Sequence, residues 1–460
     1  MRRSRRPTPR PRAHAGSSRR SRRRRAVARG SPSSRASSST GPWSSARCAR
    51  CARGSSLGHN RSDTRGEQPV TVRFGINFFS TVRQEQKPGE RYFDEALRLS
   101  VLADELGFSH VRTVEHYFRP YGGMTPSPIV FLTAVAARTT RVRLVTGAVL
   151  PIFNHPIKVA GETAMLDCIS RGRLDVGFGR AFLPEEFDAF QRSMDESRAR
   201  FEGGIAAVKR LWTETDVVYE DDFYRFGPIT SSPRPVQKPH PPIVVAAVGT
   251  PASFEWTGRQ GYRLMVVPYL SSFEALRRNL ALYREAFAGS QGRAAPPVQL
   301  SFHMHVAETD ARAIAEATPQ MDQYVALFKA SASAWQTRSS SAYPGYAEVI
   351  KELDTMTMER VLREQRAFVG APDAVAELVR GALGLFGDVE PSLSLLWGNF
   401  PYEQAERSLR LFASDVMPRF APEEVRARGL GGGAPQPAGG GAPREVPGRG
   451  LGGEAPRRLV

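Results

Sequence analysis

Between residues 69 and 420 the chain alternates short apolar runs, rich in β-branched residues, with amphipathic stretches of helical period. Eight runs predict strands, at 70–77, 110–115, 142–149, 173–178, 243–248, 263–267, 298–306 and 392–397. Alternation of strands and helices predicts a parallel sheet with right-handed crossovers. Eight such units favour an α/β fold of the (β/α)8 TIM-barrel type. An open doubly wound sheet is the main alternative, which the eight strands and the missing dinucleotide fingerprint make weaker.

The helical stretches fall between these runs. In the first, apolar residues from Phe93 to Leu106 follow the 3.6-residue period, and Gly107 is placed to end the helix. Further helices are expected at 160–169, 198–212, 252–260, 273–287, 371–385 and 403–416. Two stretches exceed a minimal barrel: 214–242 predicts a hairpin and a Pro-rich loop, and 307–370 is long and partly helical. Long insertions near strand carboxyl ends usually build or cover an active site.

The positive charge is concentrated at one end of the chain. Residues 1–68 hold 19 Arg, no Lys and two acidic residues, which accounts for +17 of the formal net charge of +18. We expect a disordered Arg/Ser-rich arm at 1–68, one that binds polyanions weakly or is not part of the working protein. The domain at 69–420 has a net charge near zero, so charge does not predict a specific nucleic-acid partner for it. A disordered Gly/Pro-rich tail is expected at 421–460.

Cysteine content and hydropathy bear on the compartment. The three cysteines, Cys48, Cys51 and Cys168, are too few for a disulfide scaffold and favour a reducing compartment. No apolar run approaches the roughly 18 residues that a membrane span needs. We therefore expect a soluble cytoplasmic protein without a membrane partner.

Candidate site residues lie just beyond the carboxyl ends of the expected strands, where barrel enzymes carry their chemistry. His116 follows the second strand, and imidazole exchanges protons near neutral pH, although a hydrogen-bonded structural histidine fits the pattern equally well. Gly179 permits close backbone approach, and Arg180 is suited to a phosphate, unless the pair is a tight turn with a solvated arginine. Glu196 and Ser197 begin a helix, where Ser197 is either an anion ligand or a cap.

Ser301, His303 and His305 alternate along the seventh strand and share one face. An H-x-H pair suits a metal-dependent barrel hydrolase, but a metal needs three or four ligands, and the sequence offers no convincing further cluster. We therefore expect no metal site.

Four motifs taken together resemble the luciferase-like flavin-dependent monooxygenases, the family of bacterial luciferase (alkanal monooxygenase). The motifs are Asp104–Phe108 leading to Thr113–Phe118, Asn154–Pro156 leading to Leu166–Arg180, Met194–Arg198, and Ser408–Ala413. The resemblance covers roughly 70–420 and implies the same (β/α)8 barrel.

The resemblance implies reduced FMN at the barrel mouth, which reacts with O2 to a flavin hydroperoxide that oxygenates a small organic substrate. It implies that His116 is catalytic, that Arg180, Glu196 and Ser197 hold the phosphate, and that Phe131 and Leu132 contact the flavin ring. It further implies a separate flavin reductase as partner, and we expect a homodimer. Gly179 stands where some luciferases carry a reactive cysteine, and His116-Tyr117 replaces their His-His pair. Both departures argue against light emission and an aldehyde substrate, but not against flavin use.

Three other functions stay open at this point. Related barrels use a deazaflavin to move hydride without oxygen, so a deazaflavin-dependent oxidoreductase is the main alternative. A metal-dependent barrel hydrolase and a nucleic-acid-binding protein that acts through its arm are the others.

Overall fold

The structure is a computed structural model that describes residues 72–338, 340–343 and 346–421. The arm expected at 1–68 and all but the first residue of the tail expected at 421–460 lie outside the described residues. The domain boundaries therefore stay predictions.

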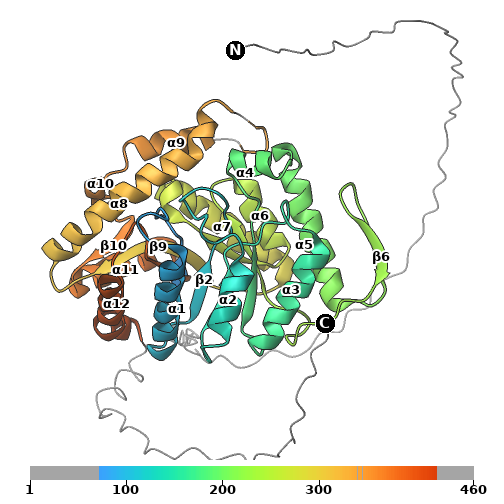
Figure 1. Cartoon of the computed structure of the whole chain (residues 1–460), viewed down its shortest axis with the longest axis horizontal. Helices are drawn as coiled ribbons and strands as arrows, with labels where there is room; N and C mark the ends of the chain where they lie inside the picture. Colours follow the sequence, from blue (N-terminus) through green and yellow to red (C-terminus); the bar gives the residue numbers. More distant parts are fainter. Residues whose placement is uncertain (1–71, 339, 344–345, 422–460) are drawn as a thin grey trace, which may run out of the picture. The chain divides into compact units, whose positions relative to one another are not determined.

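Eight parallel strands close into a barrel, which confirms the predicted (β/α)8 fold (Figure 1). The strands are β1 (Gly75–Phe78), β2 (His110–Thr113), β3 (Arg143–Thr146), β4 (Leu174–Phe178), β7 (Ile243–Ala247), β8 (Arg263–Val266), β9 (Val298–Val306) and β11 (Val389–Leu395). Neighbours follow the order β11-β1-β2-β3-β4-β7-β8, and β9 closes the ring by pairing with both β8 and β11. Each of the eight predicted strands is present, because runs of Val, Ile and Leu buried on both faces are typical of parallel sheets.

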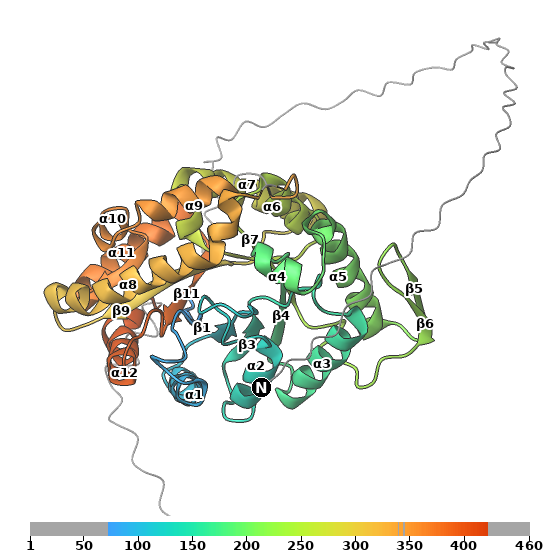
Figure 2. The ribbon, with the colours of Figure 1, turned by 45° about the horizontal axis from the view of Figure 1, so that its top comes forward.

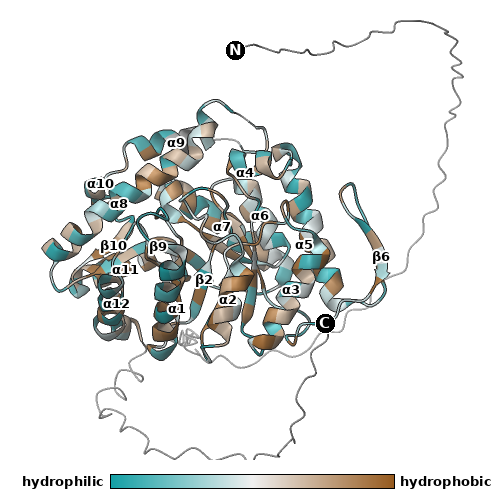
Figure 3. Ribbon diagram, in the orientation of Figure 1, coloured by the Kyte–Doolittle hydropathy of each residue, from teal (hydrophilic) through white to brown (hydrophobic). Residues whose placement is uncertain are grey.

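Helices surround the strands, as Figure 2 shows. They are α1 (Gly89–Glu105), α2 (Pro128–Ala136), α3 (Pro156–Ile169), α5 (Ser197–Thr213), α6 (Pro251–Arg259), α7 (Phe273–Gln291), α11 (Pro372–Phe386) and α12 (Tyr402–Leu411). Helix α1 buries Ala96, Leu99 and Ala103 on one face, as its period predicts. Helix α2 was not predicted, because its apolar run shows no helical period. It is visibly more hydrophobic than α12 in Figure 3.

Two insertions interrupt the barrel pattern. The first contains the predicted hairpin, formed by β5 (Val217–Glu220) and β6 (Arg225–Ile229) in antiparallel pairing. The second contains α8 (Asp310–Ala332), α9 (Tyr346–Asp354), α10 (Met358–Arg363) and β10 (Ala367–Gly370). Strand β10 pairs with the C-terminal half of β9, from His303 to Val306. Strand β8 pairs with β9 nearer its N-terminus, at Gln299 and Leu300.

Shorter elements complete the described chain. They are α4 (Pro184–Ala189), η1 (Met194–Glu196), η2 (Pro268–Leu270), η3 (Ser333–Gln336), η4 (Phe412–Val416) and η5 (Met417–Phe420).

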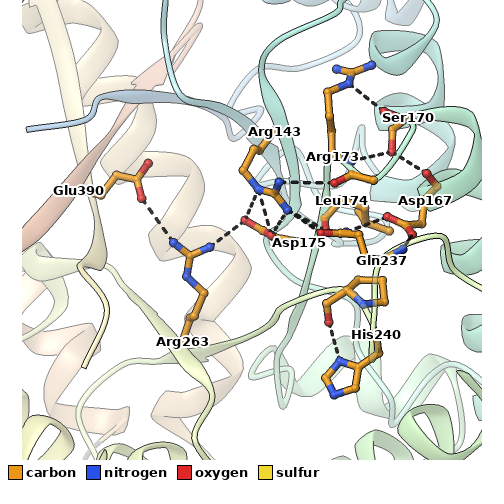
Figure 4. Close-up of polar contacts among 12 residues, drawn as sticks. Arg143, Asp167, Ser170, Arg173, Leu174, Asp175, Gln237, His240, Arg263 and Glu390 are labelled. Carbon is orange, nitrogen blue, oxygen red and sulfur yellow. Dashed lines mark hydrogen bonds and ion pairs between the residues drawn. The ribbon is translucent and has the colours of Figure 1, made fainter. Parts of the chain in front are cut away.

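The amino ends of the strands carry a buried ion-pair network (Figure 4). Asp175, whose side chain is 1% exposed, pairs with Arg143 at 2.5 Å and with Arg263 at 3.0 Å. Glu390 lies 3.2 Å from His110 and 4.0 Å from Arg263. Burial opposes ionisation of Glu390, but the hydrogen bond and charge of His110 outweigh it and lower the pKa of Glu390 to about 2. Because barrel enzymes carry their chemistry at the carboxyl ends of the strands, we interpret this network as structural.

Candidate active site

A cavity opens at the carboxyl ends of the strands, with about 1180 Å³ of empty space, part of it open to solvent. Its walls come from the segments that follow successive strands: Phe79 after β1, His116 after β2, Ala148 after β3, Arg180 after β4, Thr250 after β7 and Leu270 after β8. Ala342, Tyr343 and Tyr346 from the second insertion also line it. The insertion therefore covers the site, as its position in the sequence predicted.

His116 lies in this cavity and is held through one ring nitrogen. Its Nδ1 lies 3.0 Å from Oε1 of Glu186, a buried residue of α4, and the backbone N–H of Tyr117 donates to the same oxygen at 2.8 Å. An ionised Glu186 only accepts hydrogen bonds, and with it Nδ1 is the donating ring nitrogen. Nε2 has no hydrogen-bond partner within the described residues, so it is available to a ligand in the cavity.

Glu115 directly precedes His116, and its hydrogen bonds connect two of the sequence motifs described above. Its Oε1 accepts hydrogen bonds from the Tyr117 hydroxyl and the Asn154 amide, both at 2.7 Å, and its Oε2 accepts one from the Leu150 N–H at 3.2 Å. Burial raises the pKa of Glu115 to about 7, although these hydrogen bonds oppose the shift. Sequence reasoning missed this residue; its place before His116 in a recognised motif was the available signal.

Arg180 lines the cavity, and Ser197 is buried next to its guanidinium. The Nη2 of Arg180 lies 3.4 Å from Oγ of Ser197, the buried first residue of α5, and donates to the backbone oxygen of Ala342 at 2.6 Å. The ring of Tyr343 covers the guanidinium at 4.6 Å. The Nε of Arg180 is buried and has no partner within the described residues. An unused guanidinium donor, a hydroxyl and a helix amino end fit the phosphate of a nucleotide-like cofactor.

Gly179 also lines the cavity and leaves space beside the segment after β3. A Cβ at Gly179 would come within 3.2 Å of the Ala148 Cβ, which is tighter than ordinary packing. A larger residue would narrow the cavity there.

Besides the buried Ser197, three further predicted residues do not line the cavity. The side chain of Glu196 is 41% exposed and pairs with Arg200 at 2.8 Å. Phe131 and Leu132 lie in α2 and are buried in the core, where Phe131 packs edge-on against Phe78 with ring centroids 5.7 Å apart. The prediction of a flavin-ring contact at Phe131 and Leu132 is therefore not supported, because α2 turns this face toward β1. Gly147 and Ala148, directly after β3, line the cavity instead.

The histidines of β9 have separate structural environments. His303 lies among the rings of Tyr269, Tyr324 and Trp397, at 4.8, 4.4 and 4.8 Å, and burial lowers its pKa to about 3. His305 bonds through Nε2 to Glu316 at 2.7 Å. Within the described residues no group of three His, Cys, Asp or Glu side chains is arranged to hold a metal ion. In the same part of the chain, no helix is long and apolar enough to cross a membrane.

A sequence model described as luciferase-like monooxygenase matches residues 72–387. The chain belongs to the luciferase-like monooxygenase family. This confirms the resemblance, and the protein is a flavin-dependent oxygenating enzyme. Among solved structures, it is similar to the monooxygenase RslO1 from Streptomyces bottropensis, with 46% identity, a TM-score of 0.69, and coverage of 76% of this chain and 100% of that one.

Two curated relatives illustrate the range of the luciferase-like family. The oxygenase component of a flavin-dependent trigonelline monooxygenase from Acinetobacter baylyi is 29% identical over 363 residues, covering 78% of this chain and 98% of the relative. An F420-dependent glucose-6-phosphate dehydrogenase from Kineococcus radiotolerans is 28% identical over 342 residues, covering 70% of this chain and 92% of the relative.

Proposed function

We propose that this luciferase-like protein is the oxygenase component of a two-component monooxygenase that uses reduced FMN and O2 to oxygenate a small organic substrate. The observation that carries the proposal is that one cavity is lined both by Arg180, which lies beside the buried Ser197, and by a histidine oriented by a buried carboxylate. The sequence identity of 46% between this chain and the monooxygenase RslO1, over the whole length of RslO1, supports the assignment as an oxygenase.

In this proposal Arg180 and Ser197 hold the phosphate, and the α5 amino end adds backbone N–H groups with favourable polarity. Glu196, at the same end of α5, is assigned no direct contact, since its side chain pairs with Arg200. Bound reduced FMN supplies the two electrons with which O2 is activated.

His116 is the proposed proton-handling residue. Glu186 fixes the ring and keeps the proton on Nδ1, so that Nε2 is the atom available to the substrate. Phe182, Tyr343 and Tyr346 contribute apolar cover, which excludes water from a reaction in which water competes.

Titration with reduced FMN and with reduced F420, each followed by O2-dependent turnover, tests the proposal. We expect tight FMN binding and O2 consumption that depends on an organic substrate. F420 binding with hydride transfer and no O2 consumption would instead establish the second candidate, a deazaflavin-dependent oxidoreductase, which the F420-dependent relative favours.

The phosphate contact is tested separately with Arg180→Ala. Loss of a charged hydrogen bond should weaken FMN binding by about 1.5–3 kcal/mol. Riboflavin lacks the phosphate and should lose less, so equal losses would assign Arg180 to the ring or the fold.

Several partner assignments belong to the same proposal. The name of the trigonelline relative, an oxygenase component, supports a separate flavin reductase as the source of reduced FMN. A homodimer and a cytoplasmic location stay predictions.

A further inference from the structure

Arg112 is a buried cation at the base of the cavity. It lies in β2, one residue before the strand ends, and is 4% exposed while lining the cavity. Its Nε donates to Oδ1 of Asn77 at 3.2 Å, Nη1 lies 3.8 Å from Sδ of Met265, and Nη2 donates to the Ser301 hydroxyl. All three partners are uncharged.

The arginines at the opposite end of the barrel differ in this respect. Arg143 and Arg263 both pair with Asp175, whereas no carboxylate in the described part of the chain lies within ion-pair distance of Arg112. Burial lowers the pKa of Arg112 to about 10, so the side chain still carries its charge near neutral pH. A buried charge without a counter-ion is unfavourable, and an apolar residue of similar size would fill the space at lower cost.

The surrounding backbone makes room for this side chain. A Cβ at Gly147 would lie 2.6 Å from both Cγ and Cδ of Arg112, so only glycine fits at that position. Gly147 also lines the cavity. The structure therefore accommodates Arg112 with a second, matching residue, as expected of a built binding site.

The guanidinium of this cavity-lining residue retains binding capacity. It has five N–H donors, and its three contacts leave two of them without a partner among the described residues. A planar fork of donors in a low-dielectric site is suited to two oxygens of one anion.

We propose that Arg112 is the oxyanion-binding residue of the cavity and that its ligand is the acidic group of the organic substrate, a carboxylate or an ionised phenol or enol. This inference rests on the proposed function and specifies the substrate class for the same site. A phenol or enol bound there would be held ionised, because the cation stabilises the negative form. The ionised N–C=O edge of a reduced flavin could also place a negative charge against Arg112. The test therefore separates a substrate anion from a flavin anion.

The first arm of the test uses flavin-free protein, titrated calorimetrically with benzoate and with benzamide, its uncharged counterpart of similar shape. We expect benzoate to bind about 10- to 100-fold more tightly, as for a hydrogen bond to a charged group. Arg112→Met should abolish this preference, Arg112→Lys should retain part of it, and the control Arg263→Met should preserve it.

The second arm compares oxidised and reduced FMN in the same proteins, with melting temperature as the check on folding. The proposal expects Arg112→Met to leave the ratio of the two affinities unchanged. Absence of a benzoate preference in the wild-type protein overturns the proposal even if Arg112→Met does not fold. An Arg112-dependent preference for reduced FMN without one for benzoate also overturns it, since the anion is then the flavin.

The two arms also separate this proposal from the proposed function. If wild-type protein prefers benzoate but binds no FMN, the monooxygenase proposal fails while the oxyanion site stands. If FMN binds through Arg180 but benzoate and benzamide bind alike, the monooxygenase proposal stands and the oxyanion site is wrong.

Discussion

At the scale of single residues, His116 has a defined environment: one ring nitrogen bonded to Glu186 and the other unpaired within the described residues. We predict that His116→Ala lowers turnover by about 10²- to 10⁴-fold, the usual contribution of a positioned acid–base group. FMN affinity should change little, because the proposed phosphate contacts lie at Arg180 and Ser197. Steady-state kinetics and flavin titration on one preparation measure both quantities.

A matched control is available in β9. His305 is also buried and also bonded to a glutamate, but it does not line the cavity. His305→Gln should reduce stability and leave turnover per folded molecule unchanged. If His116→Ala behaves like this control, His116 is structural and the catalytic assignment is wrong.

Glu115 gives a prediction for the pH dependence of stability. Its pKa is raised from 4.5 to about 7 in the folded protein, so its protonated form is favoured by folding. Stability from this group is fully present below pH 4.5 and is lost as the pH rises to about 7, by up to about 3 kcal/mol. Urea unfolding of wild type and Glu115→Gln between pH 5 and pH 8 measures the effect. The variant should show a flatter profile, and parallel profiles would contradict the assignment.

The sequence identified some of these residues and not others, for a physical reason. His116 and Arg180 follow strand ends directly, so their position in a barrel follows from the strands alone. Glu186 and Asn154 reach the site from other segments, and their contacts depend on loop conformations that no local pattern encodes. Arg112 was missed because an arginine inside a strand has no periodic signal of its own.

At the scale of secondary-structure elements, all eight barrel strands were predictable, since each is a short β-branched run bounded by polar residues. Helix α2 was missed because it is apolar on most sides, which removes the periodicity on which the prediction depends. The contents of the second insertion were predicted only as partly helical. Its arrangement over the cavity depends on long-range contacts such as that of Tyr343 with Arg180.

The covering insertion leads to a prediction about coupling. The Tyr343 hydroxyl donates to the backbone oxygens of Arg180 at 3.1 Å and Ala181 at 3.0 Å, so it ties the cover to the segment after β4. Tyr343→Ala should admit water and lower the ratio of oxygenated product to reduced FMN consumed, with more hydrogen peroxide released. Quantifying product and peroxide from the same reaction measures this ratio. Phe118→Ala, at a residue that is 65% exposed, is the control and should leave the ratio unchanged.

At the scale of the whole molecule, the ion-pair network and the cavity lie at opposite ends of the barrel. The amino ends of the strands hold paired charges, and the carboxyl ends hold the cavity. We predict that Asp175→Asn destabilises the protein by about 3–5 kcal/mol, because it leaves Arg143 and Arg263 without their shared carboxylate. FMN affinity of the folded variant should match that of the wild type. A urea-unfolding series and a flavin titration measure the two effects, and a large loss of FMN affinity would show that the two ends are coupled.

Strand β9 pairs with β8 near its N-terminus, at Gln299 and Leu300, and with β10 along its C-terminal half, from His303 to Val306. One continuous backbone thus belongs both to the barrel wall and to the insertion that covers the cavity. Amide hydrogens of the β9–β10 pairing should therefore exchange with solvent more slowly than those of the rest of the insertion, because their partner strand belongs to the barrel wall. The cover is anchored at the end where the chain returns to the barrel.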